Sequence, residues 1–229
     1  MKIDWKSFLK KWTKEKGKQF PTGSIVFKGF QGSGKTLSLV HYALEIKKEF
    51  PKCTIYSNVI LYDIDYIYIE NENILNEALT CQNGSNGTLI ILDEAHLYFN
   101  KKSGIPLDVL TCISQQRKDR RRLCFTSQIW EELDVSLRKQ VKEVVSCRNL
   151  LNRVQINTVS DGESITYNKL KGDWEAKKLR TEIFKHNNDL YKKYDTRQKV
   201  IRNNQYTRTP TSQAPSVVNF TTRSSNLNR

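Results

Sequence analysis

The stretch Gly-Phe-Gln-Gly-Ser-Gly-Lys-Thr, residues 29–36, matches the phosphate-binding loop pattern G-x-x-x-x-G-K-[ST] at every fixed position. It follows the apolar stretch 24–27 and precedes an amphipathic segment that predicts a helix from Lys35 to about Phe50. Glycines let the backbone turn tightly, so that successive N–H groups surround a phosphate at the positive end of that helix. Lys35 would reach the β- and γ-phosphates, and the Thr36 hydroxyl would bind Mg²⁺. The residues predicted to bind a nucleoside triphosphate are Gly29, Phe30, Gln31, Gly32, Ser33, Gly34, Lys35 and Thr36.

A second motif consists of the apolar run Thr88–Leu92 followed by two carboxylates, Asp93 and Glu94. Such a run predicts a strand buried on both faces of a parallel sheet. Because open α/β sheets bind ligands at the carboxyl ends of their strands, Asp93 is expected to hold Mg²⁺ through water, together with Thr36. Glu94 is expected to orient the attacking water and accept its proton. The alternative is that the two acids only cap a helix at 95–97.

The composition favours a polyanionic partner. The formal net charge is +14 and the pI is about 9.5, which favours nucleic acid, with a solvated basic surface as the alternative. The five cysteines lack C-x-x-C spacing, and Cys53, Cys124 and Cys147 lie in apolar stretches expected in a reduced core. No apolar run has the length of a transmembrane helix, and the lysine-rich start lacks an apolar signal segment. We therefore expect no transmembrane segment and no secretion.

The chain divides into three predicted regions. Residues 1–20 carry seven lysines around apolar residues at helical spacing, which predicts a basic amphipathic helix that binds the core, a neighbouring subunit or a membrane surface. Residues 21–195 are expected to form the P-loop ATPase domain. Residues 196–229 contain six Lys or Arg and no acidic residue, so we expect an extended or disordered basic tail.

Strands and helices alternate through most of this domain, which is typical of a mostly parallel sheet flanked by helices. Strands are predicted at 24–27, 53–60, 88–93, 122–127 and 143–146, with a short β excursion at 62–70, and helices at 35–50, 72–80, 106–118 and 129–141. Further along, 153–159 and 164–167 are predicted to form a hairpin around Asp161-Gly162, and 174–194 to contain a helix. The predicted fold class is therefore α/β, with a C-terminal hairpin and helix.

The residues downstream of the acidic pair resemble those of the FtsK–HerA superfamily. Arg117-Lys118 ends a predicted helix, Thr126-Ser127-Gln128 closes a strand, and Asp134 and Leu137-Arg138 follow in the same order as in that superfamily. Over about residues 24–200, the chain is most like the small genome-packaging ATPases of double-stranded DNA viruses that have an internal membrane. It is also similar to the zonular-occludens-toxin-like assembly ATPases of filamentous phages.

This resemblance implies a RecA-like P-loop NTPase core that binds ATP and Mg²⁺. It implies that Gln128 is the polar sensor for the γ-phosphate or the attacking water, with a helix-capping Gln as the alternative. It also implies a homo-oligomeric ring, expected to be a hexamer, in which an arginine reaches the neighbouring subunit's nucleotide. Arg117 is the first candidate for this finger and Arg138 the second, while Arg120, Arg121 and Arg122 are interpreted as solvated or DNA-facing. The expected catalytic residues are Glu94, Lys35, Gln128 and Arg117.

The leading hypothesis is an ATP-hydrolysing DNA translocase that packages a viral double-stranded DNA genome into a preformed capsid, in the host cytoplasm or on the virion. Its partners would be the backbone of duplex DNA, further copies of the chain and a capsid or vertex protein. The alternatives are a phage assembly or extrusion ATPase, whose relatives generally carry a transmembrane segment, and a cellular FtsK–HerA-type translocase. Glu94 argues against a module that only binds nucleotide.

Overall fold

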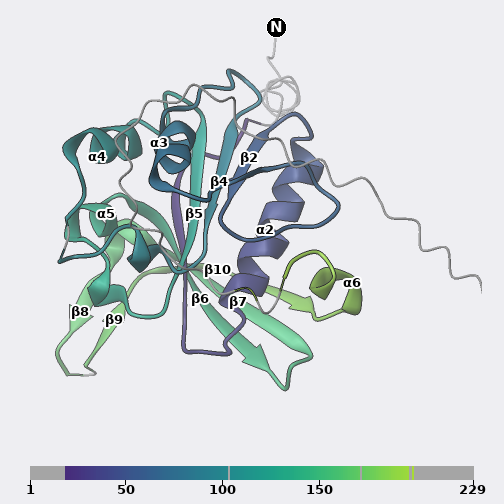
Figure 1. Cartoon of the computed structure of the whole chain (residues 1–229). Coiled ribbons are helices and arrows are strands. Elements are labelled where there is room, and N and C mark those ends of the chain that lie inside the picture. Colours follow the sequence, from purple (N-terminus) through teal and green to yellow (C-terminus); the bar gives the residue numbers. More distant parts are fainter. Residues whose placement is uncertain (1–18, 103, 171, 196–197, 199–229) are drawn as a thin grey trace, which may run out of the picture.

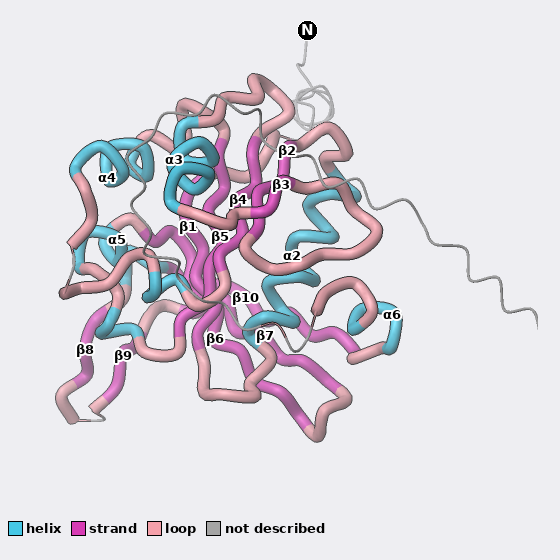
Figure 2. The backbone as a smooth tube through the Cα atoms, in the orientation of Figure 1, coloured by secondary structure: helices cyan, strands magenta, loops and turns pink. Residues whose placement is uncertain are grey.

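The computed structural model describes residues 19–102, 104–170, 172–195 and 198, which are organised around an eight-stranded sheet (Figure 1, Figure 2). The strand order is β10-β7-β6-β1-β5-β4-β2-β3, in which β7 is antiparallel to its two neighbours and the other pairs are parallel. The strands are β1 (Gly23–Lys28), β2 (Thr54–Ser57), β3 (Ile67–Tyr68), β4 (Thr88–Leu92), β5 (Arg121–Ser127), β6 (Val141–Leu150), β7 (Val154–Asp161) and β10 (Lys178–Lys185). The predicted α/β fold with a mostly parallel sheet is confirmed.

Helices cover both faces of this sheet. In Figure 1, α2 and α6 lie on one side of the strands, and α3, α4 and α5 lie on the other. The helices are α2 (Lys35–Glu49), α3 (Glu72–Thr80), α4 (Leu107–Ser114), α5 (Val135–Lys139) and α6 (Asn188–Tyr191), with 3-10 turns η1 (Ala95–Leu97), η2 (Trp130–Glu132) and η3 (Gly162–Ser164). No helix in the described ranges is both long enough and apolar enough to cross a membrane.

The central strands are buried on both faces by side chains that alternate between two layers. Ile25 and Phe27 of β1 pack with the apolar face of α2, whereas Val26 packs in the layer that contains α3 and α4. In the same way, Leu89 and Ile91 of β4 face the α2 layer. Burying a large aliphatic side chain contributes about 1.5–3 kcal/mol. The first of these layers therefore holds α2, and with it the loop before α2, against the sheet.

The helix predicted at 129–141 is wrong over most of its length. The structure forms η2 and then the extended residue Leu133 before α5 begins. Leu133 is fully buried, and the Asp134 carboxylate caps α5 by accepting a hydrogen bond from Ser136 N at 2.7 Å. Burial of Leu133 and this cap together interrupt a helix that the apolar periodicity alone favours.

The hairpin predicted between 153–159 and 164–167 is also wrong. β7 pairs instead with β6 and β10, and the chain turns between β6 and β7 at Leu151 and Asn152, both at a left-handed φ of 53°. The Asp161 carboxylate caps η3, so the expected hairpin turn becomes a 3-10 turn. The next strands, β8 (Thr166–Asn168) and β9 (Asp173–Glu175), form a separate small sheet.

The segment 174–194 is mostly extended, with only α6 helical. Its central part is β10, which pairs with β7 from Lys178 to Lys185. The backbone hydrogen bonds that a helix would form are therefore made across the sheet. Of the C-terminal hairpin and helix that the sequence predicts, the structure therefore contains only the short helix α6.

Cys53, Cys124 and Cys147 are buried, as the apolar stretches around them predict. Burial raises the pKa of all three thiols, to about 12 for Cys124 and Cys147. None of the five cysteines, all of which lie in the described residues, forms a disulfide. These thiols therefore pack as small apolar groups.

The predicted basic helix at 1–20 and the predicted tail at 196–229 lie outside the described residues, apart from residues 19, 20 and 198. Phe20 is buried and packs edge-on against Phe50, with 5.2 Å between the ring centroids. The proposed boundaries between the three regions remain predictions.

Two of the three consecutive arginines at 120–122 are buried and hold neighbouring segments together. Arg121 and Arg122, interpreted from the sequence as solvated or DNA-facing, are only 2% and 3% exposed. Arg121 donates to the Cys112 carbonyl at 2.8 Å. Arg122 forms an ion pair with Glu143 and donates to the Thr22 carbonyl at 3.1 Å. Both guanidinium groups lie at the start of β5, where they fasten it to neighbouring segments, so the earlier interpretation is wrong for these two residues.

Arg122→Ala should lower the free energy of unfolding by about 3 kcal/mol, because it leaves the partly buried Glu143 carboxylate without one of its cations. The loss stays at the low end of the usual range because Arg180 still pairs with Glu143 at 2.9 Å. Urea denaturation measures the change, with the exposed Arg153→Ala as a matched control that should shift stability by less than about 0.5 kcal/mol. Equal effects of the two substitutions would contradict a structural role for Arg122.

Candidate nucleotide site

The loop 29–36 joins β1 to α2 through left-handed backbone turns. The φ angle is 76° at Gly32 and 82° at Gly34, values that strain any other residue. A Cβ at Gly34 would also lie only 2.2 Å from Oε1 of Gln155. Glycine is therefore required at Gly34 for its conformation and for space, and α2 begins at the next residue.

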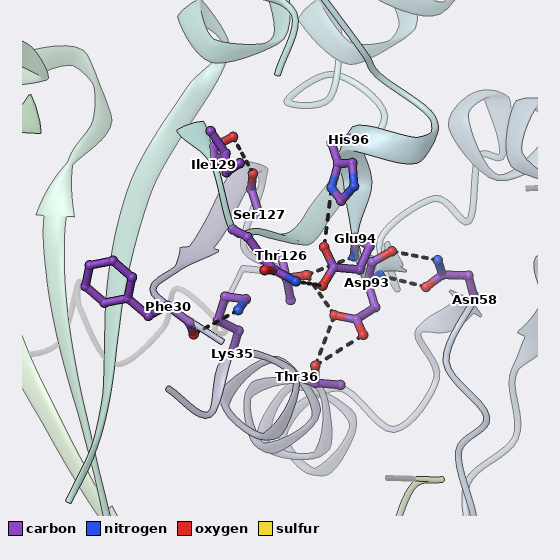
Figure 3. Close-up of polar contacts among 11 residues, drawn as sticks. Phe30, Lys35, Thr36, Asn58, Asp93, Glu94, His96, Thr126, Ser127 and Ile129 are labelled. Carbon is purple, nitrogen blue, oxygen red and sulfur yellow. Dashed lines mark hydrogen bonds and ion pairs between the residues drawn. The ribbon is translucent and has the colours of Figure 1, made fainter. Parts of the chain in front are cut away.

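Lys35 folds back over this loop. Its Nζ donates a hydrogen bond to the Phe30 carbonyl at 3.1 Å (Figure 3), and the residue is only 7% exposed. The Phe30 ring points away from Lys35 in Figure 3 and is 90% exposed. The ammonium thus stays beside the backbone N–H groups that would hold a phosphate, where a phosphate oxygen could replace the carbonyl as its partner.

The Asp93 carboxylate lies between two hydroxyl groups. Thr36 Oγ1 donates to its two oxygens at 3.1 and 3.2 Å, and Thr126 Oγ1 donates to Oδ1 at 2.7 Å (Figure 3). Burial raises the pKa of Asp93, and the hydrogen bond from Thr126 opposes that rise. The structure therefore brings together the two residues predicted to hold Mg²⁺.

Asn58, which the sequence analysis does not include in the site, holds the backbone of Asp93. Its Nδ2 donates to the Asp93 carbonyl at 2.9 Å, and its Oδ1 accepts from the Asp93 N–H at 2.7 Å. Asn58 directly follows β2, the neighbour of β4 in the sheet. The sequence does show a polar residue, Asn58, near the carboxyl end of a predicted strand. Predicting its contact with Asp93 would also require knowing that this strand lies next to β4.

The Glu94 carboxylate accepts a side-chain hydrogen bond on one oxygen, while its other oxygen is buried near an imidazole without a hydrogen bond. Gln128 Nε2 donates to its Oε1 at 2.7 Å, and His96 Nδ1 lies 3.3 Å from its Oε2. The Glu94 N–H donates to Thr126 Oγ1 at 2.9 Å, and the backbone there is left-handed, with φ of 52°. Such backbone strain in a non-glycine residue recurs at functional sites. These contacts hold the carboxylate beside Asp93, on the side away from Thr36 (Figure 3).

One cavity of about 470 Å³ connects most of these groups. The predicted site residues that line it are Gln31, Gly32, Gly34, Lys35, Thr36, Asp93, Glu94 and Gln128. Gly29, Phe30 and Ser33 line an adjoining cavity on the flank of the loop instead. The far wall of the first cavity comes from a segment that the sequence analysis leaves outside the site, with Tyr191, Tyr194 and Gln198 among its residues.

The oxygen atoms of this cavity suit Mg²⁺. That ion usually takes one or two ligands from the protein and completes its shell with phosphate oxygens and water. The Thr36 hydroxyl and the Asp93 carboxylate, within 3.2 Å of each other, provide such a pair. Within the described residues, no group of three His, Cys, Asp or Glu side chains could hold a metal ion by itself. Thr36 and Asp93 would therefore hold Mg²⁺ together with a nucleotide's phosphates.

Neither candidate arginine finger lines this cavity. Arg117 is exposed in the turn before β5, whereas Gln128 follows the other end of that strand. The Arg138 guanidinium lies 5.8 Å from the centre of the Trp174 ring, close enough for a cation–π contact. Because a finger acts on a neighbouring subunit, distance from the chain's own cavity does not decide between the two.

The family model for zonular occludens toxin (Zot) matches residues 24–198, more than half of the chain and including every residue that lines the cavity. The chain belongs to the Zot family. This is the second of the two groups that the sequence resembles. No curated protein matches the chain.

Two solved structures, one from each of the two groups that the sequence resembles, have a fold similar to that of this chain. The N-terminal domain of zonular occludens toxin from Neisseria meningitidis is 16% identical, with a TM-score of 0.55 over 76% of this chain and 98% of that one. The genome packaging NTPase B204 from Sulfolobus turreted icosahedral virus 2, in complex with sulfate, is 14% identical, with a TM-score of 0.50 over 69% of this chain and 96% of that one. At these identities the likeness establishes a common P-loop NTPase fold.

Asn58→Ala should weaken Mg²⁺-dependent nucleotide binding about tenfold and lower the free energy of unfolding by about 1–3 kcal/mol. The substitution leaves the buried N–H and carbonyl of Asp93 without partners, so the carboxylate loses its alignment with Thr36. Calorimetric titration with Mg²⁺ and an ATP analogue measures the affinity. The matched control Asn76→Ala, on the exposed face of α3, should change neither quantity, and an unchanged affinity in Asn58→Ala would contradict the alignment role.

Proposed function

We propose that this chain hydrolyses ATP, and the observation that carries this proposal is the position of Glu94. Its carboxylate lies beside the Thr36–Asp93 pair (Figure 3), accepts a hydrogen bond from Gln128 and caps no helix. A carboxylate at this point can orient a water molecule and accept its proton as the water attacks the terminal phosphorus. A chain that only bound nucleotide would not need this arrangement.

The remaining residues have complementary roles in this proposal. The loop N–H groups and the Lys35 ammonium bind the β- and γ-phosphates, with Lys35 exchanging the Phe30 carbonyl for phosphate oxygens. Gln128 donates to Glu94 in this structure and would turn its amide toward the γ-phosphate or the water once a nucleotide is present. Mg²⁺, held by Thr36 and by Asp93 through water, would neutralise charge on the phosphates.

We further propose that hydrolysis moves viral DNA. The net charge of +14 favours binding to a phosphate backbone, and B204, which has the same fold, is a genome packaging NTPase. One candidate is therefore packaging of a double-stranded DNA genome into a preformed capsid, with a capsid or vertex protein as partner, in the host cytoplasm or on the virion. The family match favours a second candidate, a phage assembly or extrusion ATPase. A cellular translocase of the same superfamily is the third.

Glu94→Gln should keep nucleotide binding and lower the rate of ATP hydrolysis by about 10²–10⁴, because an amide cannot accept the proton of the attacking water. Steady-state phosphate release measures the rate, and a separate binding titration shows that the site is intact. The exposed Glu163→Gln is the matched control and should keep full activity. Normal turnover in Glu94→Gln would contradict the proposed role of Glu94 as the acceptor of the water's proton.

The same assay distinguishes the candidate motors. Stimulation of hydrolysis by linear double-stranded DNA supports a packaging or cellular translocase, and stimulation by single-stranded DNA alone favours extrusion of a phage genome. A rate that does not respond to any DNA contradicts a DNA motor and points to a protein as the activator.

We propose that the active form is a ring, expected to be a hexamer, in which Arg117 reaches the neighbour's nucleotide. Arg117→Ala should then lose about 10³ in hydrolysis rate without weaker nucleotide binding. Mixing Arg117→Ala with Glu94→Gln subunits should restore part of the rate, because some interfaces then combine an intact base with an intact finger. If Arg117→Ala lowers only DNA affinity, Arg117 belongs to the DNA surface. The same mixing test with Arg138→Ala then decides the second candidate.

A further inference from the structure

The far wall of the cavity is formed by the segment 186–195 together with Gln198. α6 packs against α2 (Figure 1). Its last residue, Tyr191, is partly exposed and lines the cavity, and Tyr194 beyond the helix is buried. The segment crosses to the carboxyl end of β2, where the Tyr62 N–H donates to the Lys193 carbonyl at 2.8 Å. The Gln198 side chain completes the attachment, accepting from the Ile60 N–H at 2.7 Å. This wall is therefore fixed to the sheet at both ends.

A chain of hydrogen bonds joins the wall to the phosphate-binding loop. Gln155, which is fully buried, donates through Nε2 to the Ser33 carbonyl at 2.9 Å and to Asn157 Oδ1 at 3.1 Å. These two acceptors orient the amide so that its oxygen faces His186 Nε2 at 3.3 Å, which must donate. His186 Nδ1 is then the acceptor for the Tyr191 hydroxyl at 2.7 Å. The Tyr191 ring is thus held at a set position relative to the loop.

The orientation of a bound nucleotide follows from the two ends of the cavity. The N-terminus of α2 and Lys35 fix the phosphates at the loop. Glu94 lies on the side of Asp93 away from α2 (Figure 3), and Gln128 donates to it at 2.7 Å, so the terminal phosphate is expected to face that side. The cavity extends the other way from the loop to His186, Tyr191 and Gln198, which leaves that side for the nucleoside.

We infer that the segment 186–195 and Gln198 form the nucleoside-binding wall of this site, with the Tyr191 ring as the surface against which the base packs. This inference rests on the proposed nucleotide-binding function. The cavity volume of about 470 Å³ is within the range of small-molecule sites. An aromatic ring that is held in place and lines the cavity, as Tyr191 does, can stack on any base. Tyr191 therefore sets affinity for the nucleoside, while the loop binds the phosphates.

The test compares binding of Mg²⁺·ATP with binding of Mg²⁺·tripolyphosphate, which lacks the nucleoside, by calorimetric titration of the full chain. Tyr191→Ala should raise the Kd for ATP about tenfold and leave the Kd for tripolyphosphate unchanged. Tyr191→Phe keeps the ring but loses the hydroxyl that contacts His186, and it should retain most of the affinity for ATP. The matched control Tyr167→Ala, on β8, should affect neither ligand.

Equal weakening of both ligands by Tyr191→Ala would show that Tyr191 acts only through the loop, which overturns the inference. Wild-type protein that binds tripolyphosphate as tightly as ATP would also overturn it, since the nucleoside would then make no contact. Wild-type protein that binds neither ligand would instead contradict the proposed function itself. The three outcomes are therefore distinguishable.

Discussion

Burying a carboxylate is unfavourable unless hydrogen bonds or cations compensate for the lost water, and at Asp93 the hydroxyls of Thr36 and Thr126 provide that compensation. These hydroxyls belong to α2 and β5, while Asp93 follows β4, so three elements must be correctly placed for the acid to be satisfied. Asn58 adds β2 to this set by holding the Asp93 backbone. The contacts that satisfy one acid therefore also align the phosphate-binding loop with the carboxylate of Glu94.

The strands beyond the parallel core serve the same site from the opposite side. β7 brings Gln155 behind the loop, where it contacts Ser33 and leaves no room for a side chain at Gly34. β10 then leads to His186 and to the segment that closes the far wall of the cavity. The C-terminal part of the described chain therefore lines the candidate site, and the family match also extends to residue 198.

The parts of the candidate site that could be predicted from the sequence are those marked by short, continuous sequence patterns. The loop 29–36 and the pair Asp93-Glu94 combine special residue types with a short, recognisable context, and the alternating elements around them predicted a parallel sheet. Contacts that depend on strand order, such as those of Asn58 and Gln155, could not be found in this way. The wrong hairpin has the same origin, because turn residues indicate where a chain reverses but not which strand it pairs with. Arg122 likewise looks solvated until its partner Glu143 is placed beside it.

The most direct test of this account is a crystal structure of the chain with Mg²⁺ and a non-hydrolysable ATP analogue. We expect the phosphates to lie in the loop 29–36, the metal ion to separate Thr36 Oγ1 from the Asp93 carboxylate, and the base to pack against Tyr191. A nucleotide bound elsewhere, or a Thr36–Asp93 hydrogen bond that persists with the nucleotide in the loop, would contradict this account.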